Sequence, residues 1–373
     1  MKKIGIDARF FGSIGKGLGR YTQKLIENLE KTDAQNEYYI FLRKENFNEY
    51  QPRNEKFHKI LADYRWYTFS EQINMSRLLK KYNLDLVHFP HFNVPLLYRK
   101  KFVITIHDLI LVHFPTILGT TLSPFFYWLK FLAYKIVIKS AIERAKRIIT
   151  VSEFTKNDIE NHYPQARGKI RVTYEACEDF CFLASENKER ILEKYGIIKP
   201  YLMYVGNAYP HKNLDGLVSA FAYLRQENPE INLVLVGKDD YFYRKIKEQV
   251  KQKKISGVVF PGFIPDCELD AVYYSSNAYV FPSLYEGFGL PPLEAMAKGV
   301  PVVSSDHKCM KEILGDSALF FDGRNRFDME EKMRTIYMDS KLRIDLVKKG
   351  YEQIKKYSWK KMAEKTLKIY EKV

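Results

Sequence analysis

The chain has 373 residues, of which 46% are hydrophobic, so it can bury sizeable cores and is not disordered as its main state. A chain of this length usually divides into two domains. The four cysteines are scattered and form no Cys-x-x-Cys or Cys/His cluster, which excludes a disulfide scaffold and gives no sign of structural zinc.

The net charge of +15 is concentrated in the first half of the chain. Residues 1–180 contain 29 Lys and Arg against 19 Asp and Glu, a net charge of +10. Such an excess suits an anionic partner, such as lipid headgroups, a phosphorylated acceptor or nucleic acid. A solvated basic surface without such a partner is an equally good interpretation.

The first half alternates apolar runs with helical segments. Strands are expected at residues 3–8, 38–42, 86–89, 102–108 and 147–152, and an amphipathic helix at 20–29. The N-terminus has a lysine pair but no apolar stretch behind it, so it is interpreted as a strand and not as a signal peptide. A cytoplasmic location is therefore expected.

Residues 123–147 are expected to form a helix that is dense in aromatic residues, with lysines interspersed. The helix could lie in a membrane interface, with its apolar face inward, which would place the protein peripherally at the inner face of the plasma membrane. The interpretation that we favour for this helix is that it covers the first sheet, with its lysines at the rim. No run of 18 residues lacks a charge, so no membrane-spanning segment is expected.

The second half repeats the alternation. Strands are expected at residues 201–206, 231–237, 257–262, 278–283, 301–305 and 318–321. Apolar runs without apolar-polar alternation, separated by helical segments, are typical of parallel sheets covered on both faces. We therefore expect an α/β protein with two doubly wound, Rossmann-like domains at residues 1–175 and 201–356. A linker is expected at 176–200, and a final helix at 357–373 is expected to pack back toward the N-terminal domain.

The segment EGFGLPPLE, residues 286–294, follows a strand and opens a helix. Its glycines remove Cβ atoms that would block a ligand, and the backbone amides at the helix start would face an anion. Two carboxylates beside such an anion site are suited to accept hydrogen bonds from sugar hydroxyls. A phosphorylated carbohydrate is the ligand that this combination favours. The ligand contacts expected from this segment are Glu286, Gly287, Phe288, Gly289, Leu290 and Glu294.

A second candidate site is the segment YVGNAYPHKN, residues 204–213, between the first strand of the second domain and the next helix. Lys212 offers a point charge for a diphosphate, which backbone amides alone neutralise only in part. A lysine alone is more often solvated surface. Its place at the carboxyl end of a strand in the same sheet as Glu286 favours the functional interpretation.

Together these segments resemble the GT-B-fold retaining glycosyltransferases of family four, and the resemblance covers essentially the whole chain. The motifs that carry it are Gly17-Leu-Gly19-Arg20-Tyr21, Ile106-His107-Asp108, Val151-Ser152-Glu153-Phe154-Thr155, the Lys212-Asn213 turn, Pro261–Asp266, and the glutamates at 286 and 294. The resemblance implies two domains that face a central cleft. The spacing of the two glutamates is the family's most specific mark.

The resemblance also implies roles on the donor side. Glu286 would bond a hydroxyl of the transferred sugar, Glu294 the ribose hydroxyls, and Lys212 the diphosphate. Asn207 stands where family members often carry Arg, so phosphate binding would depend more heavily on Lys212 and on backbone amides.

Further roles concern the remaining motifs. Gly17 and Gly19 would let a loop of the first domain close over the phosphates, and Ile264 and Asp266 would lie where the base is held. His107 would contact the sugar and assist proton handling, although a histidine at a strand end could also be a hydrogen-bonded structural residue.

The activity implied is transfer of a hexose, such as mannose or rhamnose, from a GDP- or UDP-sugar with retention of anomeric configuration. The acceptor would be a glycan or a lipid-linked saccharide in cell-surface polysaccharide synthesis. No cofactor and no catalytic metal are expected, since the acidic pairs Asp239-Asp240 and Glu268/Asp270 have no partner that would complete a Mg²⁺ site.

Three other classes of protein were weighed. A nucleotide-sugar epimerase of similar two-domain fold is the principal alternative. A dinucleotide oxidoreductase is disfavoured, because Arg20 replaces the third glycine of the Rossmann loop and no acid ends the next strand. Nucleic-acid binding is not expected, because the aromatic residues lie in apolar runs and form no basic-aromatic stripe.

Overall fold

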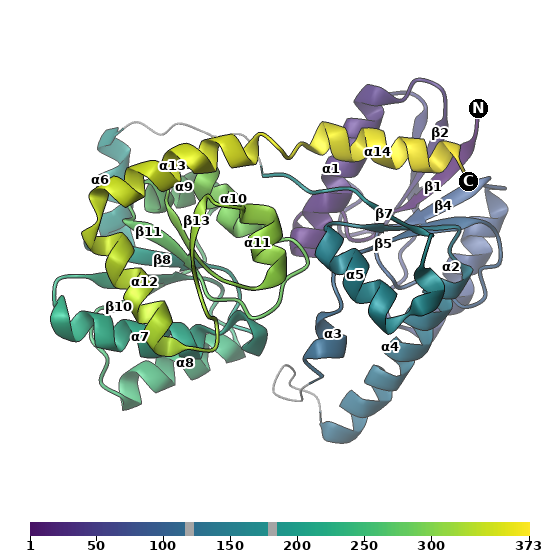
Figure 1. Cartoon of the computed structure of the whole chain (residues 1–373). Helices are drawn as coiled ribbons and strands as arrows, with labels where there is room; N and C mark the ends of the chain where they lie inside the picture. Colours follow the sequence, from purple (N-terminus) through teal and green to yellow (C-terminus); the bar gives the residue numbers. More distant parts are fainter. Residues whose placement is uncertain (116–122, 178–184) are drawn as a thin grey trace. The chain divides into compact units, whose positions relative to one another are not determined.

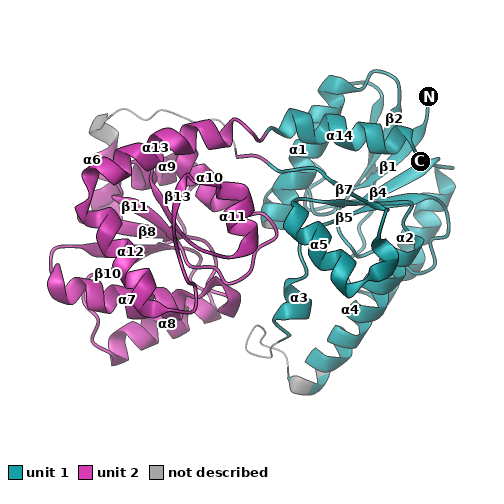
Figure 2. Cartoon of the chain, in the orientation of Figure 1, with its two compact units in different colours: residues 1–175, 358–373 teal, residues 176–357 magenta. Residues whose placement is uncertain are grey.

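The structure is a computed structural model that describes residues 1–115, 123–177 and 185–373 (Figure 1). The chain divides into two compact units (Figure 2). Unit 1 comprises residues 1–175 and 358–373, and unit 2 comprises residues 176–357. Each unit contains one fully parallel sheet, and this confirms the expected α/β class with two doubly wound domains.

Unit 1 has a seven-stranded sheet in the order β3-β2-β1-β4-β5-β6-β7. Its strands are β1 (Lys3–Asp7), β2 (Glu37–Leu42), β3 (Phe57–Leu61), β4 (Leu86–Phe89), β5 (Phe102–Ile106), β6 (Arg147–Thr150) and β7 (Ile170–Val172). The two edge strands, β3 and β7, were not predicted from the sequence. Edge strands bury less surface, so they carry a weaker apolar signal: β3 includes His58 and Lys59, and β7 is only three residues long.

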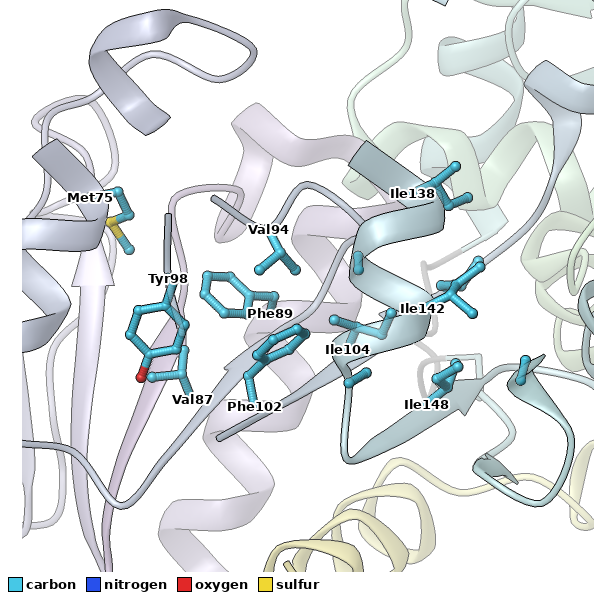
Figure 3. Close-up of a cluster of buried hydrophobic side chains, with 14 of the residues drawn as sticks. Met75, Val87, Phe89, Val94, Tyr98, Phe102, Ile104, Ile138, Ile142 and Ile148 are labelled. Carbon is cyan, nitrogen blue, oxygen red and sulfur yellow. The ribbon is translucent and has the colours of Figure 1, made fainter. Parts of the chain in front are cut away.

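The helices of unit 1 are α1 (Lys16–Thr32), α2 (Phe69–Lys81), α3 (Ile110–His113), α4 (Pro124–Arg144), α5 (Glu153–His162) and α14 (Trp359–Glu371). The core beneath α2 and α4 is made of aliphatic and aromatic side chains of β4, β5 and β6, among them Phe89, Phe102 and Ile148 (Figure 3). α14 packs on α1. Its Tyr370 hydroxyl lies 2.6 Å from Nδ1 of buried His88 in β4, which anchors this last helix in unit 1.

Unit 2 has a six-stranded sheet in the order β10-β9-β8-β11-β12-β13. Its strands are β8 (Tyr201–Val205), β9 (Asn232–Val236), β10 (Val258–Gly262), β11 (Ala278–Phe281), β12 (Val302–Ser305) and β13 (Ala318–Phe321), all within the expected segments. The helices are α6 (Ser185–Lys194), α7 (Leu214–Glu227), α8 (Tyr241–Gln252), α9 (Asp266–Tyr274), α10 (Leu290–Ala297), α11 (Lys308–Leu314), α12 (Arg326–Met338) and α13 (Ser340–Ile354).

The described part of the segment expected to be a linker, residues 176–177 and 185–200, contains a helix that its composition did not indicate. Residues 185–194 form α6, which packs on α9 of unit 2. Leu192 is buried, and Lys194 pairs with Glu268 at 2.7 Å. The helix was missed because it is mostly polar and draws its stability from a contact with α9, about 70 residues further along the chain.

Candidate active site

The strand order of unit 2 places two loops side by side at the carboxyl ends of the strands. The chain moves from β8 to β9 on one side, and β11 lies on the other side of β8. Open parallel sheets bind ligands at such a point, where the strand order reverses. The two loops are residues 206–213, after β8, and residues 282–289, after β11, and they contain the two segments singled out in the sequence.

The structure brings Lys212 and Glu286 into contact at this point. Lys212 Nζ lies 2.5 Å from Glu286 Oε1, and the Ser283 hydroxyl donates to the same oxygen at 2.5 Å. Both side chains are largely covered: Lys212 is 15% exposed and Glu286 10%. An ammonium has three donors, so Lys212 can hold Glu286 and still offer hydrogens to an anionic ligand.

The charge state of this cluster follows from its contacts. Burial alone would raise the pKa of Glu286, but the Lys212 ammonium and the Ser283 hydroxyl hold it below its ordinary value. Burial and the same ammonium lower the pKa of neighbouring His211 to about 4. At neutral pH the site therefore presents one cation, one carboxylate and one neutral imidazole.

Asn213 and Asn207 shape the loop that carries Lys212. Asn213 has a left-handed backbone (φ 57°), and its side-chain amide donates to the carbonyls of Pro282, at 3.3 Å, and Gly323, at 2.8 Å. This amide ties the loop after β8 to the loop after β11. The backbone carbonyl of Asn207 accepts a hydrogen bond from the Tyr204 hydroxyl at 2.7 Å. The Asn207 side chain is half-buried and adds no positive charge to the site.

The Gly-Phe-Gly turn is fixed by packing within unit 2. Gly289 has φ +94°, and a Cβ atom there would lie 2.6 Å from Met310 Cε, so only glycine fits without rearrangement. Leu290 then begins α10, with prolines in its first turn. Phe288 is 4% exposed and contacts the Tyr357 ring edge-on. Gly287 and Phe288 can therefore reach a ligand through their backbone, and the Phe288 side chain belongs to the core.

Three other residues expected to contact the donor, Glu294, Ile264 and Asp266, also lie in unit 2. Glu294 is half-buried in α10, one turn after Leu290. Ile264 and Asp266 follow β10, two strands from β8 and so about 10 Å away across the sheet. The Ile264 side chain is buried, so it would meet a base through its backbone, whereas adjacent Phe263 is 72% exposed. Neither Phe263 nor Ser283 was predicted individually from the sequence as a site residue.

His107 lies in unit 1, directly after β5. Its Nδ1 is 3.1 Å from a Glu175 carboxylate oxygen and its Nε2 is 3.1 Å from the Pro90 carbonyl. Both partners only accept hydrogen bonds, so each ring nitrogen can bond the partner it faces only when that nitrogen carries a proton. The Tyr21 ring packs edge-on against the imidazole at 4.7 Å, and Thr155 Oγ1 donates to the His107 carbonyl at 3.2 Å. The histidine is held in one orientation while remaining partly exposed.

The two glycines of the first motif differ in what surrounds them. A Cβ atom on Gly19 would overlap the carbonyl oxygens of Gly12 and Phe10, so this glycine serves the packing of α1 on the preceding turn. A Cβ atom on Gly17 would meet nothing within 4 Å. Of the two, Gly17 is the one whose missing side chain leaves open space for a ligand.

Two parallel sheets with this strand order define the GT-B class of fold. A solved structure from Anabaena, HepE in complex with UDP and glucose, superposes with a TM-score of 0.73 at 15% identity and covers 100% of both chains. Residues 15–177 match the model of Glycosyltransferase Family 4, and residues 187–353 match that of Glycosyl transferases group 1. The chain belongs to this family of glycosyltransferases.

The names of two similar proteins specify the sugar that those proteins transfer. The O-antigen chain mannosyltransferase B of Escherichia coli is 30% identical over 240 residues, which cover 62% of this chain and 62% of the relative. The O-antigen chain mannosyltransferase RfbU of Salmonella typhimurium is 28% identical over 275 residues, 73% of this chain and 70% of that protein. The matched segments therefore span 62% and 70% of the length of these relatives.

Proposed function

We propose that the protein transfers a hexose, mannose in the first instance, from a nucleotide diphosphate sugar to a saccharide or lipid-linked acceptor with retention of configuration. The observation that carries the proposal is the Lys212–Glu286–Ser283 cluster at the strand-order reversal of unit 2. It combines a cation for the diphosphate with a charged carboxylate for sugar hydroxyls. The two O-antigen mannosyltransferases among the relatives support mannose and cell-surface polysaccharide synthesis.

In the proposed reaction the bond between the anomeric carbon and the diphosphate oxygen breaks. The acceptor oxygen bonds to the same face of that carbon, and the acceptor proton passes to the departing phosphate oxygen. Lys212 and the free amides at the start of α10 would stabilise the negative charge on the leaving diphosphate. Glu286 would hold a hydroxyl of the transferred sugar, and Glu294 those of the ribose. His107 would contact the sugar from unit 1.

The acceptor is proposed to meet a group of aromatic side chains at the carboxyl end of the unit 1 sheet. Phe10 and Trp66 stack at 4.4 Å, and the His91 ring lies 5.4 Å from Phe10. Trp66 Nε1 and His91 Nδ1 are buried and have no hydrogen-bond partner within the described residues. Aromatic faces suit the apolar face of a sugar ring, whereas the two buried nitrogens would reach its hydroxyls only after a side-chain movement.

Helix α4 offers a reason to place the acceptor in a membrane. Large apolar side chains at i, i+3, i+4, i+7 and i+11 along one face of this helix are at least half exposed; they are Phe125, Trp128, Leu129, Leu132 and Ile136. Exposed Lys130, Lys135 and Lys139 lie among them. An apolar stripe with lysines suits the interface of an anionic bilayer, where lipid-linked acceptors reside. No helix within the described residues is both long and apolar enough to cross a membrane.

The membrane proposal is tested by flotation with liposomes of zwitterionic lipid alone and with about one third anionic lipid. The full chain should float with the anionic vesicles, and the double variant Leu129→Ser/Leu132→Ser should not. The matched control is Met338→Ser/Ile344→Ser, which removes equally exposed apolar side chains from α12 and α13. Flotation that is the same for all three proteins, or absent for all, would contradict the assignment of α4.

The transfer proposal is tested by a screen of GDP- and UDP-sugars. Thermal shift should select one donor, and that donor should then release its nucleoside diphosphate only when a glycan acceptor is present. Conversion of the donor to another sugar nucleotide without an acceptor would instead identify an epimerase. The assay is repeated in EDTA, which should not inactivate transfer; a loss that Mg²⁺ restores would show a catalytic metal.

A further inference from the structure

Two histidines and an aspartate converge on unit 1, in a cluster that takes no part in the proposed transfer. His113 Nε2 lies 2.9 Å from each carboxylate oxygen of Asp158, and His162 Nδ1 lies 3.3 Å from Asp158 Oδ1. One ligand atom from each of the three residues falls within 4.8 Å of the other two. Asp158 and His162 are one turn apart on α5, and His113 is the last residue of α3.

The chemistry of this donor set is selective. Two imidazoles and one carboxylate suit zinc and neighbouring transition metals, whereas Mg²⁺ and Ca²⁺ take oxygen ligands. Ligand atoms bound tetrahedrally at about 2.0–2.1 Å from zinc lie about 3.4 Å apart. The separations of 2.9 and 3.3 Å are slightly shorter than that value, and the third, between the two imidazole nitrogens, is at most 4.8 Å. Binding through His162 Nδ1 would also replace its contact with the Asp158 backbone carbonyl, which is 2.9 Å away.

The surroundings of the three side chains also suit a metal. Asp158 is 9% exposed, whereas the histidines are 32% and 36% exposed, which leaves room for solvent to complete the coordination. A carboxylate held between two imidazoles can also be a hydrogen-bonded cluster without metal, and the experiment below distinguishes the two.

We propose that His113, Asp158 and His162 form a zinc site that joins α3 to α5. The segment that zinc would join to α5 is residues 107–113, which directly follow β5, begin with His107 and include α3. At its start, Thr155 of α5 donates to the His107 carbonyl at 3.2 Å. At its end, the metal would bind His113 to Asp158, three residues beyond Thr155 on the same helix. Zinc would thus fasten the His113 end of residues 107–113 to α5, while the Thr155 hydrogen bond fastens the His107 end. Together the two would restrain the backbone that presents His107.

Equilibrium dialysis of the full chain without a histidine tag, followed by metal analysis, tests the proposal. One Zn²⁺ per chain should bind saturably, and Co²⁺ should give the visible absorption of a tetrahedral site. His113→Ala and His162→Ala should each weaken binding by at least about tenfold, since even outer-shell partners of metals are worth 10–100-fold. The matched control is His58→Ala, which removes another exposed imidazole that is paired with a carboxylate, that of Glu37 at 2.9 Å.

A second readout follows the segment itself. Zinc should slow amide hydrogen exchange in α3 of the wild-type protein and should leave it unchanged in His113→Ala. Circular dichroism verifies that each variant is folded. The absence of saturable binding at about 100 μM free zinc would overturn the proposal. Binding that His58→Ala weakens as much as the two cluster variants would overturn it as well. Neither result bears on donor transfer, which is measured separately.

Discussion

The two units share a strand order, but a cation near the point where that order reverses has different surroundings in each unit. In unit 2 the cation is Lys212, partly exposed and paired with one carboxylate, Glu286. In unit 1 it is Arg9, which is completely buried and bonded to two carboxylates: its Nη2 lies 2.7 Å from Asp7 and 2.6 Å from Glu71. The Arg9 guanidinium also donates to the Tyr64 carbonyl at 3.1 Å.

This difference separates a structural use of charge from a functional one. A buried cation whose donors are all directed at protein acceptors cannot turn toward a ligand without leaving carboxylates unpaired. A partly exposed cation that has more N–H donors than protein acceptors can bind a ligand and keep its carboxylate partner. One strand order therefore supports a rigid network in unit 1 and a candidate phosphate site in unit 2.

The largest effect is expected from Arg9→Met. It would leave Asp7 and Glu71 buried without their cation, which should lower the free energy of unfolding of unit 1 by about 3–5 kcal/mol. All three tryptophans (Trp66, Trp128 and Trp359) lie in unit 1, so tryptophan fluorescence during urea unfolding reports this unit selectively.

The control for Arg9 is Lys355→Met, which breaks an exposed pair with Glu352 and should leave unfolding unchanged. If Arg9→Met unfolded at the wild-type urea concentration, the buried network would not stabilise unit 1. The contrast between the two units would then be wrong.

The next effect concerns activity. Lys212→Met should lower kcat/KM for transfer by about 10²–10³-fold and weaken binding of the nucleoside diphosphate, because the cation is proposed to hold both donor and leaving group. Glu286→Gln should lower kcat while changing nucleotide affinity little, since its proposed partner is the sugar. Kinetics with the selected donor and calorimetric titration with the nucleoside diphosphate measure the two quantities.

Lys298→Met is the matched control for Lys212. Lys298 is also in unit 2, is 19% exposed and pairs with Asp270 at 2.9 Å. It should retain wild-type kinetics. If all three variants lost activity equally, the defect would be general, and the donor site would not be where we place it.

The fold was largely predictable from the sequence, because buried parallel strands are continuous apolar runs. All six strands of unit 2 were anticipated, whereas β3, with His58 and Lys59 in it, was not. Edge strands and polar helices such as α6 depend on contacts with distant segments. No local pattern signals such contacts.

The candidate site was predictable in part for the same reason. Lys212 and Glu286 each follow a strand, so the rule for parallel sheets placed them at one edge. Ser283 carried no signal of its own, although it bonds Glu286. The contact between Arg9 and Glu71 joins residues 62 apart, and no local pattern predicted it.

Acidification should sharpen the comparison between the units. Burial lowers the pKa of His88 and His91 in unit 1 to about 3, and burial with the Lys212 ammonium lowers that of His211 in unit 2 to about 4. Histidines that are neutral when folded and protonated when unfolded reduce stability as pH falls below about 6.5. Between pH 6 and 4.5 unit 1 should therefore lose roughly 3 kcal/mol per pH unit and unit 2 about half as much.

Hydrogen exchange followed by mass spectrometry, with peptides assigned to each unit, measures this acid response. Glu286 adds little in that range, because the stability that comes from its lowered pKa is lost mainly as the pH falls below 4.5, the ordinary pKa of the carboxyl in the unfolded chain. His211→Asn should flatten the response of unit 2 alone. Equal slopes for the two units in the wild-type protein would contradict the prediction.

The smallest effect separates a glycine required by the fold from one left open for a ligand. Gly289→Ala must adopt φ +94° and displace Met310, so it should destabilise unit 2 by about 1–3 kcal/mol. Gly17→Ala meets no atom within 4 Å and lies in α1, so stability should not fall, while donor affinity should fall if this position faces the phosphates. Circular dichroism melting and donor titration provide the two readouts. If donor affinity were unchanged in Gly17→Ala, the open space beside Gly17 would not contribute to donor binding. The motif at residues 17–21 would then serve only the close packing of Gly19 against the preceding turn.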